Sequence, residues 1–164
     1  MYDINSNSVF DTFLGHAVTG PLAAKGIRLK QATVITTRWG AWKREHPTTT
    51  VLLERYALGS DPDFRNGRDA NGPIFPVGDV DPRLPVHDDV IGVITATGKP
   101  IAFQRSAAFI ALNRGDSVAF ENVNLALDAG GIKAIDGDGS DLGSHQAFWF
   151  AWSQFHPETR LWFP

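Results

Sequence analysis

A pattern of aromatic, imidazole and hydroxyl residues, Trp-x-x-Trp-x-x-x-His-Pro-x-Thr, occurs twice in this chain, at residues 39–49 and 149–159. The two copies hold four of the five tryptophans and two of the five histidines, so coincidence is a poor explanation. A repeat of this kind is typical of a duplicated structural unit. We therefore predict one domain with two pseudo-repeated units, at about residues 1–57 and 90–164, joined by a long loop at residues 58–89.

The first copy predicts a short helix followed by a strand. Trp39, Trp42 and His46 share one helix face, because positions i, i+3 and i+7 lie on the same side of a helix. Proline disfavours a helical conformation at the residue before it, so we expect the helix to end near His46. The threonines at 36–37 are candidates for the N-cap, and residues 50–54 are expected to form the strand.

The second copy predicts the same arrangement. Trp149, Trp152 and His156 share a helix face, and Ser144 is the candidate N-cap. Residues 159–163 are expected to form the matching strand. We expect both helices to bury their tryptophan faces against a sheet, because an indole contributes a large apolar area and needs only one polar partner.

The aromatic and imidazole side chains of both copies are also the candidate ligand-binding residues: Trp39, Trp42, His46, Trp149, Trp152 and His156. Indoles exposed in a groove could stack on a sugar, and paired imidazoles could share a metal or a proton. We favour a structural role, since a histidine in the last helical turn interacts favourably with the helix dipole. A histidine that binds a metal usually has an acidic partner, and no acidic residue recurs beside both histidines.

Composition excludes several classes of function. The net charge of −3 is spread along 164 residues, so no basic stripe exists to meet the phosphates of a nucleic acid. The absence of cysteine excludes disulfides, thiolate catalysis and cysteine-based metal sites. No apolar run reaches membrane-spanning length, and the N-terminus lacks the features of a signal peptide. We expect no membrane partner, and a cytoplasmic location if the chain is complete.

Sequence blocks along most of the chain have a distinctive order. They are Met1-Tyr2-Asp3, the run from Gly15 to Ala23, the first aromatic copy, the runs at residues 74–77, 81–85 and 90–93, and the second aromatic copy. Together these blocks resemble the domain-of-unknown-function family numbered 3179. The resemblance implies that this chain corresponds to the C-terminal part of longer family members, whose additional N-terminal part carries a Cys-Pro-x-x-Cys-like motif. It implies no established activity, cofactor or substrate.

The predicted loop at residues 58–89 is rich in aspartate, glycine and proline. Asp81, His87 and Asp88 are the candidate catalytic residues, and His87, Asp88 and Asp89 are the candidate metal ligands. Carboxylates and an imidazole in one loop could bind a divalent cation or perform acid–base work. The favoured interpretation is a solvated turn in which aspartates cap backbone N–H groups. We predict no cofactor, and leave a divalent cation open.

The rest of the chain predicts antiparallel strands and one more helix. Residues 90–95 and 99–103 form a hairpin, and residues 105–113 form a helix capped by Ser106 and ended by Gly115. Further strands are expected at residues 117–121, 123–127 and 132–135, and a small antiparallel meander within residues 1–29. The stretch from Asp136 to Asp141 resembles the start of a calcium loop, but lacks the glycine and glutamate at positions six and twelve, so we interpret it as an acidic turn.

The fold class that follows is α+β, with antiparallel strands and short aromatic helices around one core. No phosphate-binding glycine loop, Gly-x-Ser-x-Gly elbow or His-Glu-x-x-His motif is present. We favour a non-catalytic structural or small-ligand-binding module. The alternative is a hydrolase or metal-assisted enzyme, carbohydrate-directed for instance, that uses the aspartates and histidine of the long loop. A homo-oligomer formed through an open sheet edge is a further hypothesis.

Overall fold

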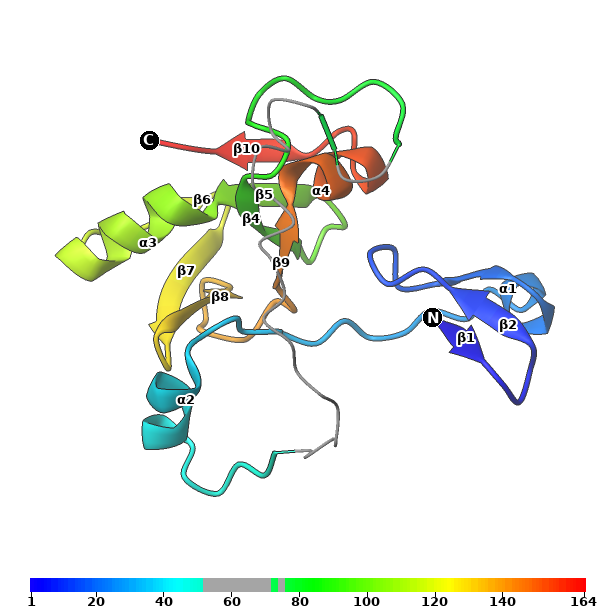
Figure 1. Cartoon of the computed structure of the whole chain (residues 1–164), viewed down its shortest axis with the longest axis horizontal. Coiled ribbons are helices and arrows are strands. Elements are labelled where there is room, and N and C mark those ends of the chain that lie inside the picture. Colours follow the sequence, from blue (N-terminus) through cyan, green and yellow to red (C-terminus); the bar gives the residue numbers. More distant parts are fainter. Residues whose placement is uncertain (52–71, 74–75) are drawn as a thin grey trace. The chain divides into compact units, whose positions relative to one another are not determined.

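A computed structural model describes residues 1–51, 72–73 and 76–164 of the chain (Figure 1). The chain divides into two compact units, residues 1–32 and residues 33–164. Helices and antiparallel strands both occur, so the predicted α+β class is confirmed. None of the helices in the described ranges combines the length and apolar character that crossing a bilayer requires.

The first unit is a three-stranded antiparallel meander followed by one helical turn. Its strands are β1 (Tyr2–Asp3), β2 (Ser8–Phe10) and β3 (Ala17–Thr19), paired in that order. Helix α1 (Pro21–Ala24) begins at a proline. Proline suits the first helical position because a backbone N–H there would have no partner within the helix, and proline lacks that N–H. The meander predicted within residues 1–29 is therefore confirmed.

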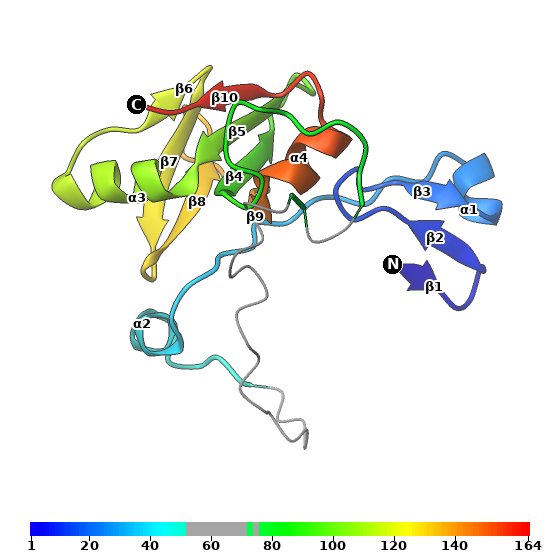
Figure 2. The ribbon, with the colours of Figure 1, turned by 45° about the horizontal axis from the view of Figure 1, so that its top comes forward.

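The second unit contains a four-stranded sheet in the order β10-β5-β4-β9 (Figure 2). Its strands are β4 (Asp89–Ile94), β5 (Pro100–Gln104), β9 (His145–Phe148) and β10 (Arg160–Trp162). The β4–β5 hairpin is antiparallel and was predicted, whereas β10 lies parallel to β5. Strand β4 is central and its four middle residues are buried, which explains its nearly continuous apolar sequence.

A second, three-stranded antiparallel sheet and helix α3 complete the main core. The strands are β6 (Ala119–Phe120), β7 (Val123–Asp128) and β8 (Gly131–Ile135), and α3 spans Arg105–Arg114. Helix α3 contacts β4, β5 and β7, so it joins the two sheets. Its end at Gly115 (φ 88°) is the left-handed helix end that the sequence predicted. Buried residues at this junction include Ile91, Val93, Ile101, Phe103, Val118, Val123 and Leu125.

Helix α4 (Trp149–Phe155) carries the second aromatic copy and lies against β4 and β9. Trp149 and Trp152 are fully buried, as predicted. The ring of Trp152 rests on the backbone of β4 at Gly92, where any Cβ would lie well inside van der Waals contact of the indole. Glycine at this position is therefore what allows the helix to approach the sheet closely.

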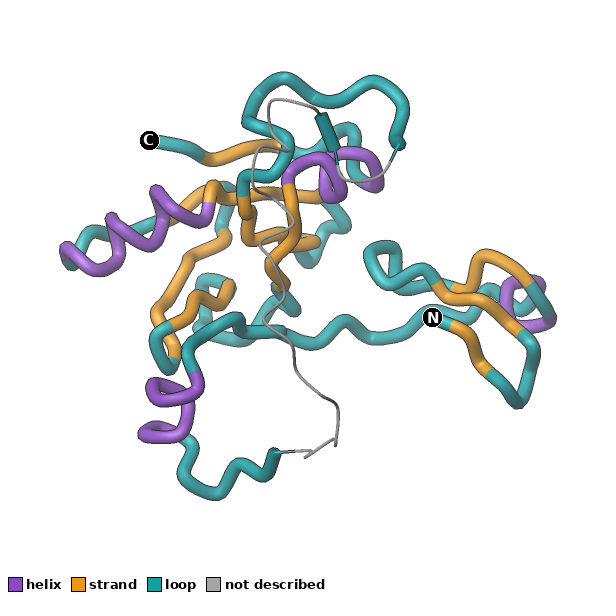
Figure 3. Tube along the Cα trace, in the orientation of Figure 1, coloured by secondary structure: helices purple, strands orange, loops and turns teal. Residues whose placement is uncertain are grey.

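Helix α2 (Trp39–Glu45) carries the first copy and has no buried residue. Trp39 is 50% exposed, so the prediction that both helices bury their tryptophan faces is wrong for α2. Residues 29–38, which lead to it, lie outside helices and strands (Figure 3). Of the strand predicted at residues 50–54, positions 52–54 lie outside the described residues, and so do residues 58–71 and 74–75 of the predicted loop. The larger pseudo-repeat units and the single domain stay predictions.

The three predicted N-caps are wrong, since none of these helices has a side-chain cap hydrogen bond. The hydroxyl of Thr37 instead donates to the carbonyl of Ala129, and the hydroxyl of Ser144 accepts from the N–H of Ala134. Strand β9 occupies residues 145–148, so α4 begins at Trp149 rather than near Ser144. These hydroxyls make tertiary bonds that local sequence does not reveal.

We expect Gly92→Ala to destabilise the chain by about 1–3 kcal/mol, because the added methyl group would force the Trp152 ring off the sheet. The matched control is Gly40→Ala in α2, where nothing lies within 4 Å of an added Cβ. There the substitution should stabilise by roughly 0.5–1 kcal/mol through helix propensity. Denaturant unfolding measures both, and equal effects of the two substitutions would contradict this view of Gly92.

Candidate functional site

The two aromatic copies fold into the same local structure, which we call the Trp–His–Thr clip: Trp42, His46 and Thr49 in one copy, and Trp152, His156 and Thr159 in the other. In each clip the indole N–H donates to the threonine hydroxyl, at 2.9 Å and 2.8 Å respectively. The histidine ring lies on the indole, with centroids 4.0 Å and 4.2 Å apart. Backbone bonds from histidine N–H to tryptophan O and from threonine N–H to histidine O close both clips. The repeated pattern therefore specifies a helix end, held by the proline stop and the threonine.

The α4 clip is part of the core and is tied to several segments. Thr159 is buried together with Trp152, so the indole donor is satisfied out of contact with solvent. Trp149 donates to the carbonyl of Asp81 at 3.0 Å. The guanidinium of Arg83 lies over the Trp149 ring and donates to the carbonyl of Thr159. In this conformation Trp149 and Trp152 present no face to a ligand, and their placement supports a structural role.

The α2 clip lies beside the turn between β7 and β8. The carboxylate of Glu45 accepts from the N–H of Ala129 at 3.1 Å. The His46 imidazole is 3.7 Å from the carboxylate of Asp128, which also pairs with Lys133 at 3.0 Å. Half-exposed Trp39 is the most accessible indole of the two copies, and the Lys43 ammonium lies 5.7 Å from its ring centre.

The candidate catalytic and metal residues have separate partners. Arg83 donates to both carboxylate oxygens of Asp81, and these bonds hold the pKa of Asp81 below its usual value. The His87 ring is buried and makes edge-on contacts with the rings of Phe148 and Phe150.

Asp88 accepts from the Gln104 amide at 2.8 Å, and Asp89 begins strand β4. Among residues 1–51, 72–73 and 76–164, no three acidic or histidine side chains are grouped so as to hold a metal ion. Three further aspartates of the predicted loop, Asp61, Asp63 and Asp69, lie outside the described residues.

His145 is a titratable residue of the core that sequence analysis did not single out. It lies in β9 opposite Gly92, and its ring meets the edge of Trp152 at 5.6 Å. Burial lowers the pKa of His145, because the charged imidazolium loses hydration there. The neutral ring is thus part of the packing around Trp152.

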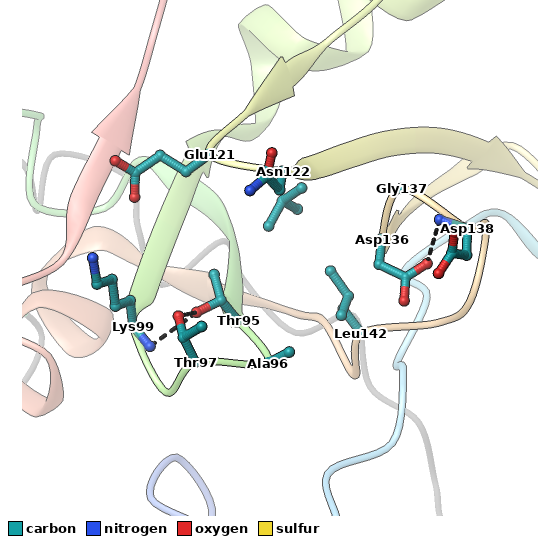
Figure 4. A pocket seen from close by; sticks show the side chains of 11 residues that line it. Thr95, Ala96, Thr97, Lys99, Glu121, Asn122, Asp136, Gly137, Asp138 and Leu142 are labelled. Atoms are coloured by element: carbon teal, nitrogen blue, oxygen red, sulfur yellow. Dashed lines mark hydrogen bonds between the residues drawn. The ribbon is translucent and has the colours of Figure 1, made fainter.

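A cavity of about 490 Å³ lies where three turns of the second unit meet (Figure 4). We call it the three-turn cavity; its walls are the β4–β5 turn (residues 95–99), the β6–β7 turn (residues 121–122) and the β8–β9 connection (residues 136–142). Lys99 and Glu121 lie on one side, and Asp136 and Asp138 lie on the other (Figure 4). Val123 and Leu142 add apolar surface. The volume lies within the range of small-molecule sites, and the lining is more polar than in most of them.

The first and third walls of the cavity are fixed by hydrogen bonds within their own turns. In the first turn, the Thr95 hydroxyl accepts from the N–H of Lys99 at 2.9 Å. In the third, one carboxylate oxygen of Asp136 accepts from the N–H groups of Asp138 and Ser140. The interpretation of this stretch as an acidic turn is confirmed. Because these two walls are held by bonds within their own turns, the shape of the cavity is set by the chain itself.

The second wall has an unusual backbone. Glu121 and Asn122 both have positive φ, at 50° and 65°, as a two-residue hairpin turn requires. Asparagine is common in this conformation, but glutamate is not, and strained non-glycine residues often lie at functional sites. Arg160 holds Glu121 by an ion pair and lies over the ring of Phe120. The sequence signal that could have indicated this turn is the very short, glycine-free connection between the strands predicted at residues 117–121 and 123–127.

Comparison with known families adds one finding. The family model described as "Protein of unknown function (DUF3179)" matches residues 1–138. The chain belongs to the DUF3179 family. This confirms the resemblance found in the sequence, and the match includes the first aromatic copy and most of the three-turn cavity. The second copy of this DUF3179 chain lies beyond the matched residues. No curated protein and no solved structure matches it.

We expect Thr159→Val to cost about 1–3 kcal/mol of stability, since it leaves the buried indole N–H of Trp152 without an acceptor. The matched variant Thr49→Val should cost less, because the Trp42 bond is only partly buried and water can replace the hydroxyl. Serine at either position keeps the oxygen and serves as control. Denaturant unfolding followed by tryptophan fluorescence checks the order, and a larger loss at Thr49 would contradict it.

The lowered pKa of His145 predicts a dependence of stability on pH. In the unfolded chain this imidazole titrates near 6.5 and therefore binds protons more readily than in the folded chain. Above pH 6.5 the ring is neutral in both the folded and the unfolded chain. As the pH drops below this value toward the folded pKa, the unfolded chain binds the proton first, and the free energy of unfolding falls. Melting temperatures between about pH 7.5 and 5.5, where carboxylates stay ionised, should fall less for His145→Gln than for the wild type. Parallel curves would show that His145 does not cause the change.

Proposed function

We propose that this chain is a non-catalytic module that binds a small polar ligand in the three-turn cavity, on a frame held together by the apolar core and the α4 clip. The observation that carries the proposal is the cavity itself, because locally pinned turns bring side chains of both charge signs to one hollow of about 490 Å³. Turns on a rigid sheet are common places for binding residues, since their side chains vary without disturbing the core.

The other candidate sites give weaker support. A second hollow of about 570 Å³ lies beside Asp81 and Arg83, but these two charges pair with each other. Stacking on the aromatic copies would have to use Trp39, because Trp149 and Trp152 are fully buried. The hydrolase alternative would have to draw Asp81, His87 and Asp88 away from their present partners. Self-association through a sheet edge stays a prediction, which light scattering tests.

A panel of small sugars, free amino acids and short peptides tests the proposal by thermal melting. A ligand that binds only the native chain raises the melting temperature by mass action, by an amount that grows with its concentration. Ala96→Trp, which fills the cavity from its first wall, should abolish the shift. Ile110→Trp adds the same side chain at an exposed position on α3 and should leave the shift unchanged. A shift that survives Ala96→Trp would move the site elsewhere, and no shift with any compound would overturn the proposal.

A further inference from the structure

The charges of the three-turn cavity are arranged unequally. Lys99 and Glu121 lie at one end, and the carboxylate of Glu121 is already paired with Arg160 (Figure 4). The combined charge of these three side chains is positive. Asp136 and Asp138 supply two carboxylates at the other end. The cavity therefore has a cationic end and an anionic end.

This separation selects a class of ligand. A neutral sugar would satisfy hydroxyl and amide groups but would gain nothing from the opposed charges. A purely anionic ligand would meet repulsion from Asp136 and Asp138, and a purely cationic ligand would meet repulsion from Lys99. A molecule with an anionic end and a cationic end matches the two charged ends of the cavity in one orientation.

We propose that the three-turn cavity binds a small zwitterion, a free amino acid or a short peptide with free ends, whose carboxylate faces Lys99 and whose ammonium group faces Asp136 and Asp138. The inference rests on the proposed function and adds the class of ligand. The Lys99 side chain is exposed, and two hydrogen bonds to Thr95 hold the Lys99 backbone, so the side chain extends from a fixed position. The Asp136 carboxylate is half-buried and immobilised by the backbone of its own turn.

Hydroxyl groups add a second selective feature. Thr95 and Thr97 lie on the wall of Lys99, with their oxygens 3.0 Å apart. A carboxylate beside Lys99 could accept from the Thr97 hydroxyl, whereas Thr95 already accepts from a backbone N–H. Leu142 lies between the charged walls (Figure 4), and with Val123, which also lines the cavity, it would contact the apolar part of the ligand.

Isothermal titration calorimetry with four probes tests the orientation: alanine, glycylglycine, N-acetyl-glycylglycine and glycylglycine amide. The wild type should bind alanine or glycylglycine, and each capped peptide, having lost one charge, should bind roughly three- to fivefold more weakly than glycylglycine, as expected for exposed ion pairs. Lys99→Met should remove the preference for the free carboxylate only, and Asp138→Asn the preference for the free ammonium only. Whichever of alanine and glycylglycine binds with the higher affinity identifies the ligand length that the cavity accepts.

Lys25→Met and Asp116→Asn make the same changes in net charge at exposed positions outside the cavity, and should leave all four affinities unchanged. If capped and free peptides bind equally, or if both preferences survive the cavity variants, the zwitterion is wrong. Binding of a neutral sugar that Ala96→Trp blocks but Lys99→Met does not change would overturn this inference and leave the proposed function standing. If neither zwitterions nor sugars bind, both are overturned.

Discussion

The contact between Trp152 and Gly92 is the constraint on which the arrangement of the second unit depends. The indole is fully buried on a strand whose backbone must be bare at that point. Its N–H donates to Thr159, immediately before β10, so the same side chain sets where that strand joins β5. Trp149, one turn earlier, fixes the segment at Asp81. A single short helix thus joins the centre of the sheet, one of its edges and a distant loop.

The two copies of the aromatic pattern show which parts of the fold a sequence specifies. Helix ends, the β4–β5 hairpin and the left-handed helix end at Gly115 follow from local chemistry, and all were predicted. The clip is local as well, since its tryptophan and threonine are seven residues apart in both copies. Burial is not local: Trp152 meets a glycine of β4, while Trp39 of the first copy is half exposed. The same motif therefore has two environments, and the pattern alone cannot tell them apart.

Tertiary hydrogen bonds of hydroxyl side chains explain two of the three errors in the predicted helix starts. Thr37 and Ser144 precede the helices as caps often do, but they bond Ala129 and Ala134 across the fold. The candidate site escaped prediction for a related reason. Its walls are far apart in sequence, and each taken alone is an ordinary turn. The pairing of β6 with β7 and of β7 with β8 brings the second and third walls together, and the contact of β8 with β4 places the β4–β5 turn beside them.

Stability and the proposed binding would depend on different residues in this arrangement. The apolar junction and the α4 clip hold the sheets, while the cavity side chains project from turns whose backbones are bonded within themselves. Replacing Lys99 or Asp138 removes a charge without removing a bond that shapes its turn, because the bonds of those turns are made by Thr95 and Asp136. Glu121 differs, since its ion pair with Arg160 ties the β6–β7 turn to β10. Under the proposed function, a substitution at Lys99 or Asp138 would therefore change ligand selectivity without changing the fold, whereas a substitution at Glu121 would alter both.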